Sequence, residues 1–198
     1  MPLPVGGGFL IVSIDSAYIL AGGQSRRMGR DKLFLDCGGE PLLVRTLGIC
    51  REAFASVTLV VRSLDKFKSL GCEVLLDNPQ AQGPMAGVIA ALEDCAQEYC
   101  FITAADLYDL DTQVADRLCA SYRGEQYLGL RESDLPQPLC GIYHRSALPH
   151  LKRRAAVGQF RMIEAIAGLE HRLLPIGSEK WRNINCPSDL VGIGVRHG

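Results

Sequence analysis

The sequence has little net charge and no long apolar run. Its 21 Lys and Arg residues are nearly balanced by 22 Asp and Glu residues, for a formal net charge of −1. A protein that coats nucleic acid carries an excess of positive charge, so we expect no nucleic-acid partner. No apolar run is long enough to span a bilayer. We also find no secretory signal peptide, in which a charged segment and then an apolar segment precede a cleavage site. These absences predict a cytoplasmic protein that does not bind a membrane.

Patterns typical of zinc sites and disulfide frameworks are also missing. The eight cysteines include no C-x-x-C pair, and only four histidines are present. Disulfide frameworks belong to short secreted domains, so we expect free thiols. Cys140 and Cys186 are expected to be small buried residues rather than nucleophiles. The cysteines are at positions 37, 50, 72, 95, 100, 119, 140 and 186.

The apolar pattern predicts an α/β fold. Expected strands are 17–21, 57–61, 73–76, 99–103, 127–131, 138–143 and 171–175. Expected helices are 41–54, a short one from 65, 85–95, 112–122, 147–154 and 160–167. This alternation predicts a three-layer α/β/α arrangement around a mostly parallel, Rossmann-like sheet, with ligands at the carboxyl ends of the strands. We expect residues 1–16 to be an N-terminal extension and residues 17–198 to be a single domain.

The segment AYILAGGQSRRMGRDK, residues 17–32, is the most specific feature of the chain. A short apolar strand ends in Gly22 and Gly23, which let the backbone turn sharply and approach a ligand closely. Four basic residues follow that suit phosphate oxygens, namely Arg26, Arg27, Arg30 and Lys32. Neither the Walker pattern nor the dinucleotide fingerprint is present, which argues against a hydride-transferring dehydrogenase. The segment predicts a polyphosphate-binding loop; the alternative is a solvated surface turn.

A first carboxylate, Asp77, follows the expected strand 73–76. It precedes GPMAG, residues 83–87, at the expected start of a helix, where free amides and glycines suit a nucleotide. The alternative is that Asp77 is only a turn residue before Pro79.

A second carboxylate, Asp106, follows the expected strand 99–103. Mg²⁺ usually binds one or two carboxylates together with substrate phosphates, so Asp106 is a candidate metal ligand. Asp109 and Asp111 are rivals, but each also suits the N-cap of the next helix.

The stretch LAGGQSRRMGRDK resembles the signature L-A-G-G-x-S-x-R-M-G-x-D-K of nucleotidyltransferases, in particular the molybdenum cofactor guanylyltransferases. The double glycine favours guanylyl transfer over the related cytidylyltransferases and sugar-phosphate nucleotidyltransferases. The resemblance implies a nucleotidyltransferase fold with a nucleotide half at about 17–125 and an acceptor half at about 126–190. It also implies transfer of GMP from GTP to molybdopterin or its metal-loaded form, with Mg²⁺ and with release of pyrophosphate.

The resemblance implies roles for individual residues. Arg26, Lys32 and Asp106 would be catalytic, and Asp106 would also hold the metal, although Leu107 and Tyr108 follow it where the family usually has Asp-x-Pro. Asp77 would contact the guanosine. The implied nucleotide-binding residues are Leu20, Ala21, Gly22, Gly23, Lys32, Asp77, Gly83, Gly87 and Asp106.

On the acceptor side, WRNINCPSDL resembles the closing motif N-x-N-T-P-x-D-L. It implies that Asn183 and Asn185 bind the pterin; alternatively they only stabilise a turn before Pro187. Residues 137–139 (QPL) are a candidate cleft wall or an ordinary strand start. No role is carried over to Arg62 or Ser63. Contacts with cofactor-assembly proteins or acceptor apoenzymes are a further expectation, and a nucleotide-binding module without turnover is the alternative from another class.

Overall fold

The structure is a computed structural model that describes residues 13–22, 32–34, 36, 39–64, 67, 70–132 and 135–176; nothing is described of the Lys32 side chain. Seven strands in this part of the chain form one sheet. They are β1 (Ser16–Leu20), β2 (Ser56–Val61), β3 (Glu73–Leu76), β4 (Tyr99–Ala104), β5 (Tyr127–Glu132), β6 (Leu135–His144) and β7 (His171–Pro175).

The sheet is mixed but mostly parallel. Its strand order is β3-β2-β1-β4-β6-β5-β7. Strand β6 runs antiparallel to β4 and β5, whereas the other neighbouring pairs are parallel. The carboxyl ends of all strands except β6 therefore meet at one edge of the sheet, and β6 begins at that edge.

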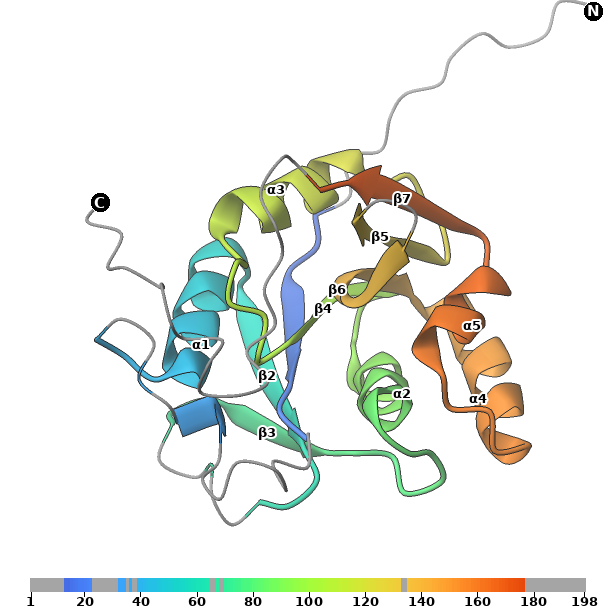
Figure 1. Cartoon of the computed structure of the whole chain (residues 1–198), viewed down its shortest axis with the longest axis horizontal. Helices are drawn as coiled ribbons and strands as arrows, with labels where there is room; N and C mark the ends of the chain where they lie inside the picture. The colour runs from blue at the N-terminus through green and yellow to red at the C-terminus, as the bar shows by residue number, and fades with distance from the viewer. Residues whose placement is uncertain are drawn as a thin grey trace, which may run out of the picture.

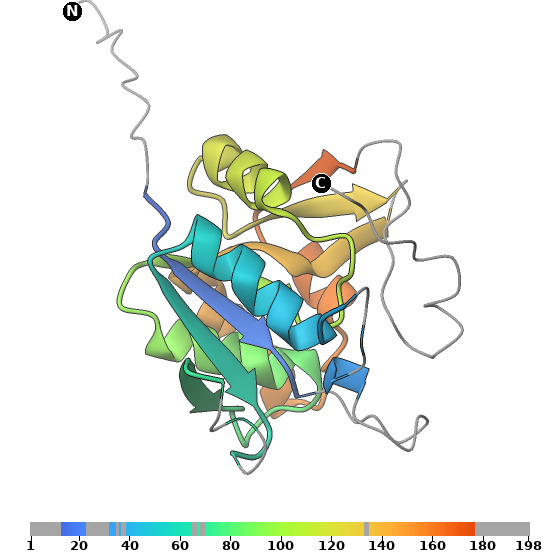
Figure 2. The same cartoon turned by 90° about the vertical axis from the view of Figure 1, so that its left-hand side faces the viewer.

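Helices cover both faces of the sheet, which confirms the expected three layers. They are α1 (Leu42–Ala53), α2 (Pro84–Asp94), α3 (Thr112–Ser121), α4 (Leu148–Ala156) and α5 (Met162–Ala167), with short 3-10 helices η1 (Lys32–Phe34) and η2 (Arg145–Ala147). Figures 1 and 2 show α1 and α3 on one face and α2, α4 and α5 on the other. Each face has its own buried apolar cluster against the sheet.

Helix α2 is apolar on most of its circumference because it lies between the sheet and α4. Eight consecutive residues, 85–92, are buried.

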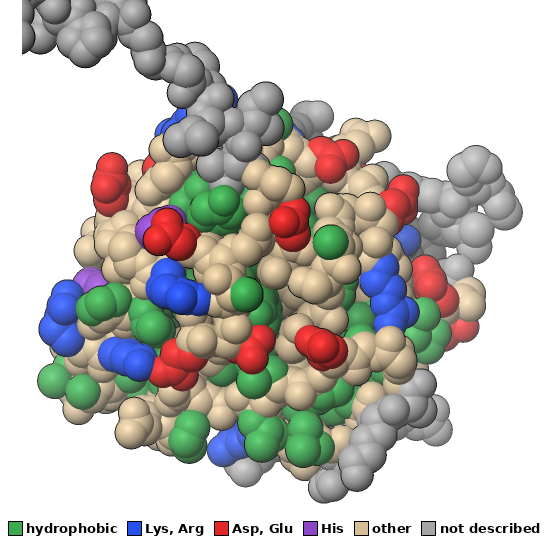
Figure 3. All heavy atoms as spheres, turned by 180° about the vertical axis from the view of Figure 1, so that it is seen from behind, with side chains coloured by type: hydrophobic (Ala, Val, Ile, Leu, Met, Phe, Trp, Pro, Cys, Tyr) green, Lys and Arg blue, Asp and Glu red, His purple; other side chains and the backbone are tan. Residues whose placement is uncertain are grey.

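Charged side chains lie on the surface. Figure 3 shows basic and acidic groups interspersed on the face seen from behind, in keeping with the near-zero net charge. No helix in the described ranges is both long and apolar enough to cross a bilayer.

Most expected elements are present to within one or two residues, but β6 begins earlier than predicted. It starts at Leu135, and the pairing with β5 shifts register between Gly129 and Leu130. The prolines of β6 hid the start of this strand from the sequence pattern, since proline within a sheet is confined to edges and bulges. Pro138 is accommodated because the register shift takes residues 138–140 out of the ladder with β5, whereas Pro136 stays in it, opposite Arg131. Of the short helix expected from 65, only residues 67 and 70 fall in the described part, where they form a turn and a bend.

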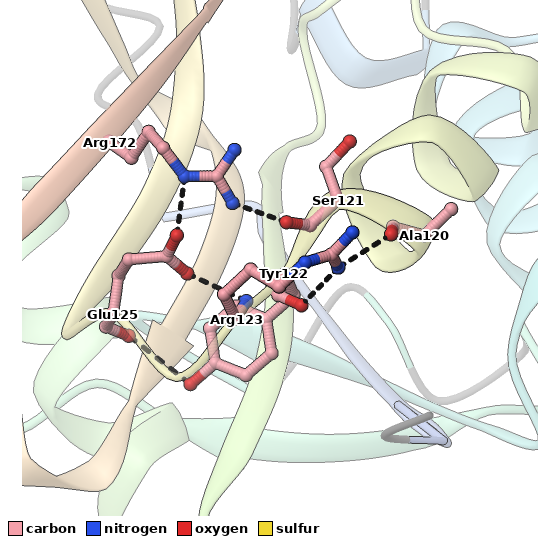
Figure 4. Close-up of polar contacts among 6 residues, drawn as sticks. All are labelled: Ala120, Ser121, Tyr122, Arg123, Glu125 and Arg172. Carbon is pink, nitrogen blue, oxygen red and sulfur yellow. Dashed lines mark hydrogen bonds and ion pairs between the residues drawn. The ribbon is translucent and has the colours of Figure 1, made fainter. Parts of the chain in front are cut away.

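The far edge of the sheet is fixed to the loop between α3 and β5. The Arg172 side chain of β7 pairs with Glu125 and donates a hydrogen bond to the Ser121 carbonyl (Figure 4). Arg117 of α3 donates to the Pro175 carbonyl at 2.7 Å. Burial would raise the pKa of Glu125, but the Arg123 amide and the Arg172 guanidinium outweigh it and hold that pKa below its ordinary value. These contacts hold β7 in place at the end of the described chain.

Candidate functional site

The candidate site lies where β1, β3 and β4 end. The Ala21 amide donates to the Val60 carbonyl at 2.8 Å, and the Ala105 amide donates to the Leu20 carbonyl at 3.0 Å. The loops after β1 and β4 therefore leave the sheet side by side. This geometry brings Gly22 and the loop of Asp106 to the same edge.

Asp77 lies directly against the start of the glycine loop. A β-carbon built on Gly22 would be 2.9 Å from Asp77 Oδ2. A β-carbon on Gly87 of α2 would be 3.4 Å from Asp77 Oδ1 and 2.8 Å from Leu20 Cδ2. Four of the predicted nucleotide-binding residues, from two loops, a strand end and a helix, thus pack together in space.

Asp77 is half-buried, and Arg62 lies beside it. Val61 and Leu76 are register partners, and the Asp77 amide donates to the Val61 carbonyl at 2.9 Å, so Arg62 and Asp77 end neighbouring parallel strands. Burial raises the pKa of Asp77 above its ordinary value, and the positive charge of Arg62 offsets part of that rise. Arg62 is a residue of this site to which the sequence comparison assigned no role.

The start of α2 presents backbone amides toward this edge. Gly83, the N-cap, has φ +60° and ψ −149°, and its cap position has no side-chain hydrogen bond. A residue with a β-carbon adopts such a positive φ rarely, which explains the glycine. Pro84 occupies the first turn, where its missing N–H costs no helical hydrogen bond. The combination leaves the N-terminus of α2 without a side-chain cap, and such an end can bind an anion.

The loop that carries Asp106 is shaped without the family's proline. Leu107 and Leu110 are buried and anchor it to the core. The Arg45 guanidinium of α1 lies over the Tyr108 ring, 5.2 Å from its centroid, a cation–π contact. Asp106 itself is partly exposed at the edge of the sheet.

The rival carboxylate Asp111 has a structural role. Its Oδ1 accepts a hydrogen bond from the Val114 amide at 2.8 Å, which makes it the N-cap of α3. No group of three or more His, Cys, Asp or Glu side chains gathers in the described ranges in a way that could hold a metal ion. The donor chemistry of Asp106, a hard carboxylate at the mouth of the candidate site, fits a magnesium ion shared with substrate phosphates.

Strand β6 reaches the same edge. Thr103 of β4 pairs with Cys140 of the antiparallel β6, so residues 135–138 extend beyond the carboxyl end of β4. The Tyr127 hydroxyl donates to the Gln137 carbonyl at 2.8 Å, and the Tyr143 hydroxyl donates to the Pro138 carbonyl at 2.7 Å. Cys140 is fully buried, as expected, and burial raises the pKa of its thiol.

Several predicted site residues lie outside the described part of the chain. These are Gly23, Arg26, Asn183 and Asn185, together with the side chain of Lys32; Cys186 lies there too. Their assignments stay predictions.

A glycine loop, a half-buried carboxylate and a second carboxylate at the carboxyl edge of a mostly parallel sheet define a nucleotidyltransferase. Residues 17–171 match the family model described as "MobA-like NTP transferase domain", and the chain belongs to this family.

Curated relatives and solved structures agree with this assignment. A probable molybdenum cofactor guanylyltransferase from Opitutus terrae is 34% identical over 86% of this chain and 90% of its own length. The molybdenum cofactor guanylyltransferase of Vibrio atlanticus is 26% identical over 94% of this chain and 98% of its own. The crystal structure of molybdopterin-guanine dinucleotide biosynthesis protein A from Archaeoglobus fulgidus superposes with a TM-score of 0.76 at 25% identity, over 90% and 96% of the two chains.

Proposed function

We propose that this chain transfers GMP from GTP to the terminal phosphate of molybdopterin, or of its molybdenum-loaded form, and releases pyrophosphate. The names of the relatives support this substrate pair. The observation that carries the proposal is the packing of Asp77 against Gly22 and Gly87 at the mouth of the glycine loop.

Asp77 is suited to read guanine. The Watson–Crick edge of guanine carries two neighbouring N–H donors, and an ionised carboxylate accepts two hydrogen bonds side by side. Adenine, cytosine and uracil do not offer that pair of donors. Because Asp77 is half-buried, a mismatched base would leave it without partners away from water, which is the costly case. Selectivity for GTP follows from that asymmetry.

The chemistry requires alignment more than proton transfer. An oxygen of the acceptor phosphate attacks the α-phosphorus of GTP, and the bond from that phosphorus to the bridging α–β oxygen breaks, so pyrophosphate leaves with the bond electrons. The acceptor is already anionic and needs no general base. Asp106 would hold Mg²⁺, which supplies Lewis-acid stabilisation of phosphate oxygens when bound. Arg26 and Lys32 would stabilise the charge on the leaving pyrophosphate.

On the acceptor side, Asn183 and Asn185 would bind the pterin, with residues 137–139 of β6 as part of the cleft wall. The start of β6 supports this arrangement because it extends past the end of β4, toward the loop of Asp106. We also propose that the protein works in the cytoplasm, where it meets other cofactor-assembly proteins or acceptor apoenzymes.

One assay tests the reaction. Pyrophosphate release is measured with Mg²⁺ and with GTP, CTP, UTP or ATP, in the presence and absence of molybdopterin. We expect release with GTP only, and only when molybdopterin is added. Release with CTP would instead indicate a cytidylyltransferase. If a sugar phosphate replaces molybdopterin as the acceptor and pyrophosphate is still released, the chain is a sugar-phosphate nucleotidyltransferase. GTP binding without release under any of these conditions would indicate a nucleotide-binding module.

Lys32→Ala provides a second test of the mechanism. We expect turnover to fall while thermal unfolding stays close to that of the wild type, because lysine would act on charge that develops only in the transition state. Unchanged pyrophosphate release by this variant would contradict the role of Lys32.

A further inference from the structure

The residue after Asp77 is held by more polar contacts than a turn requires. The Asn78 amide donates to the Ala86 carbonyl at 3.2 Å, and its carbonyl accepts from the Ala81 amide at 3.3 Å. Its side-chain Oδ1 accepts from the Gln80 amide at 2.9 Å, the turn that asparagine commonly forms before proline. Asn78 therefore fixes the backbone between Asp77 and the first turn of α2.

The remaining donor of Asn78 points to an ion pair. Asn78 Nδ2 donates to Glu93 Oε2 at 2.9 Å, and Glu93 Oε1 lies 2.6 Å from Lys152 Nζ. Lys152 and Asn78 together hold the pKa of Glu93 below its ordinary value. The chain of contacts runs from the loop after β3, across the last turn of α2, to α4.

The space beneath this loop is not filled by apolar packing. A cavity of about 230 Å³ lies between α2 and α4, lined by Asn78, Gln80, Ile89, Lys152, Ala155 and Ala156. Ala81 of the loop is buried in the apolar cluster around α2, and on the side of the cavity the loop is held by the polar chain from Asn78 to Lys152.

We propose that Asn78 is a positioning residue for Asp77, and that Glu93, itself oriented by Lys152, holds Asn78 in place. This inference rests on the proposed function, in which the Asp77 carboxylate binds the guanine base. Asp77 and Asn78 are adjacent in the chain, so a shift of the Asn78 turn moves the Asp77 carboxylate relative to Gly22 and Gly87.

The effect belongs to binding rather than to the chemical step. The base keeps the same contact in the ground state and in the transition state, so a misplaced Asp77 raises the KM for GTP and leaves kcat nearly unchanged. It also reduces the preference for GTP over ITP, because inosine lacks the exocyclic amine that a correctly placed carboxylate accepts from. Loss of fold stability alone changes neither the KM nor this preference in the folded fraction.

A polarity swap provides the test. Asn78→Asp keeps the Oδ1 acceptor for Gln80 but sets a carboxylate against Glu93. Adding Glu93→Gln restores a donor toward position 78 and an acceptor toward Lys152. Glu164→Gln is the matched control, since Glu164 is also ion-paired, with Arg154 and Arg161, but has no contact with this loop.

For Asn78→Asp we expect the KM for GTP to rise about five- to tenfold, the loss of about one hydrogen bond between Asp77 and the base, with kcat changed by less than about twofold. The double variant should recover most of the wild-type KM and GTP-over-ITP preference, and Glu164→Gln should match the wild type in both. Lys152→Met, which leaves Asn78 and Glu93 intact, should raise the KM less than Asn78→Asp does.

A wild-type KM and preference in folded Asn78→Asp would overturn the proposal, as would a double variant no better than the single one. If Asn78→Asp does not fold, Glu93→Gln and Lys152→Met decide the question by the same two measurements. Failure of the proposed function is recognised separately: a wild-type enzyme without preference for GTP over ATP, CTP and UTP would refute the guanine contact, whatever the variants do.

Discussion

The Asp77 carboxylate and Gly22 are in contact: a β-carbon at Gly22 would lie 2.9 Å from Asp77 Oδ2, closer than real β-carbons come to other atoms. Any larger residue at position 22 would therefore have to displace the Asp77 carboxylate or the loop. The start of the glycine loop and the carboxylate proposed to bind the base are parts of one packed unit.

Gly22→Ala tests this contact directly. The added methyl group must displace either Asp77 or the loop, so we expect the affinity for GTP to fall at least about tenfold, the cost of misplacing groups that bind in a fixed geometry. Titration of the folded variant with GTP measures the loss.

Gly48→Ala is the control for that substitution. Gly48 is exposed in the middle of α1, and a β-carbon there would meet nothing within 4 Å. We expect GTP affinity to be unchanged and the free energy of unfolding to rise by about 0.5–1 kcal/mol, since alanine favours a helix over glycine. Equal GTP affinity in the Gly22→Ala and Gly48→Ala variants would show that the contact at Gly22 has no role in binding.

Asp77→Asn should separate stability from selectivity. Burial raises the pKa of Asp77 in the folded protein, so its ionised form at neutral pH opposes folding. The neutral asparagine avoids this cost, and we expect Asp77→Asn to unfold at a higher temperature than the wild type at pH 7. The preference for GTP over ATP should fall by about tenfold or more, because the charged acceptor is lost.

The stability advantage of Asp77→Asn should depend on pH. A carboxyl whose folded pKa is raised favours folding only while it is protonated, so the wild type loses this stability as the pH rises from the unfolded pKa, about 3.9, to the folded one. The advantage of Asp77→Asn should be absent below that range and complete above it. Thermal unfolding at a series of pH values measures it; an advantage that grows toward acid pH would contradict the burial of Asp77.

Much of this site could be predicted from the sequence because its parts are local. Asp77 follows an apolar strand directly, and a carboxylate after a parallel strand lies at the ligand edge whatever the neighbouring strands are. The partner of Asp77 could not be predicted in the same way. Arg62 becomes its neighbour only through the register of β2 with β3.

The contacts of Glu93 with Asn78 and Lys152 were hidden for the same reason, since they join a loop, a helix end and a second helix. The shape of the Asp106 loop was hidden for a chemical reason. The family's proline is absent, and the loop is instead held by buried Leu107 and Leu110, with Tyr108 under Arg45.

Arg62→Ala should raise the pH at which GTP affinity begins to fall on the acid side. The Arg62 charge lowers the pKa of Asp77, so its removal raises that pKa further. The ionised carboxylate is the form that accepts from guanine, and GTP affinity should therefore begin to fall at a higher pH in the variant than in the wild type. Affinities measured across the acid range test the shift. Arg153→Ala, which removes an exposed arginine on α4, should leave the profile unchanged, and a coincident profile for Arg62→Ala would exclude the electrostatic role.

Substitutions of Asp106 and Asp111 should have different effects. The first should lower turnover, and the second should lower stability. Asp106→Asn keeps the size of the side chain but removes the charge that would bind Mg²⁺, so we expect magnesium-dependent turnover to be abolished with little change in unfolding. Asp111→Ala removes the acceptor of the Val114 amide at the start of α3, which should cost about 0.5–2 kcal/mol of unfolding free energy while kcat stays close to that of the wild type. Denaturant titration and pyrophosphate release, measured on both variants, give the two quantities. Full activity in Asp106→Asn would indicate that Asp109 or Asp111 holds the metal instead. Loss of activity in folded Asp111→Ala would then favour Asp111, which would hold the metal as well as cap the helix.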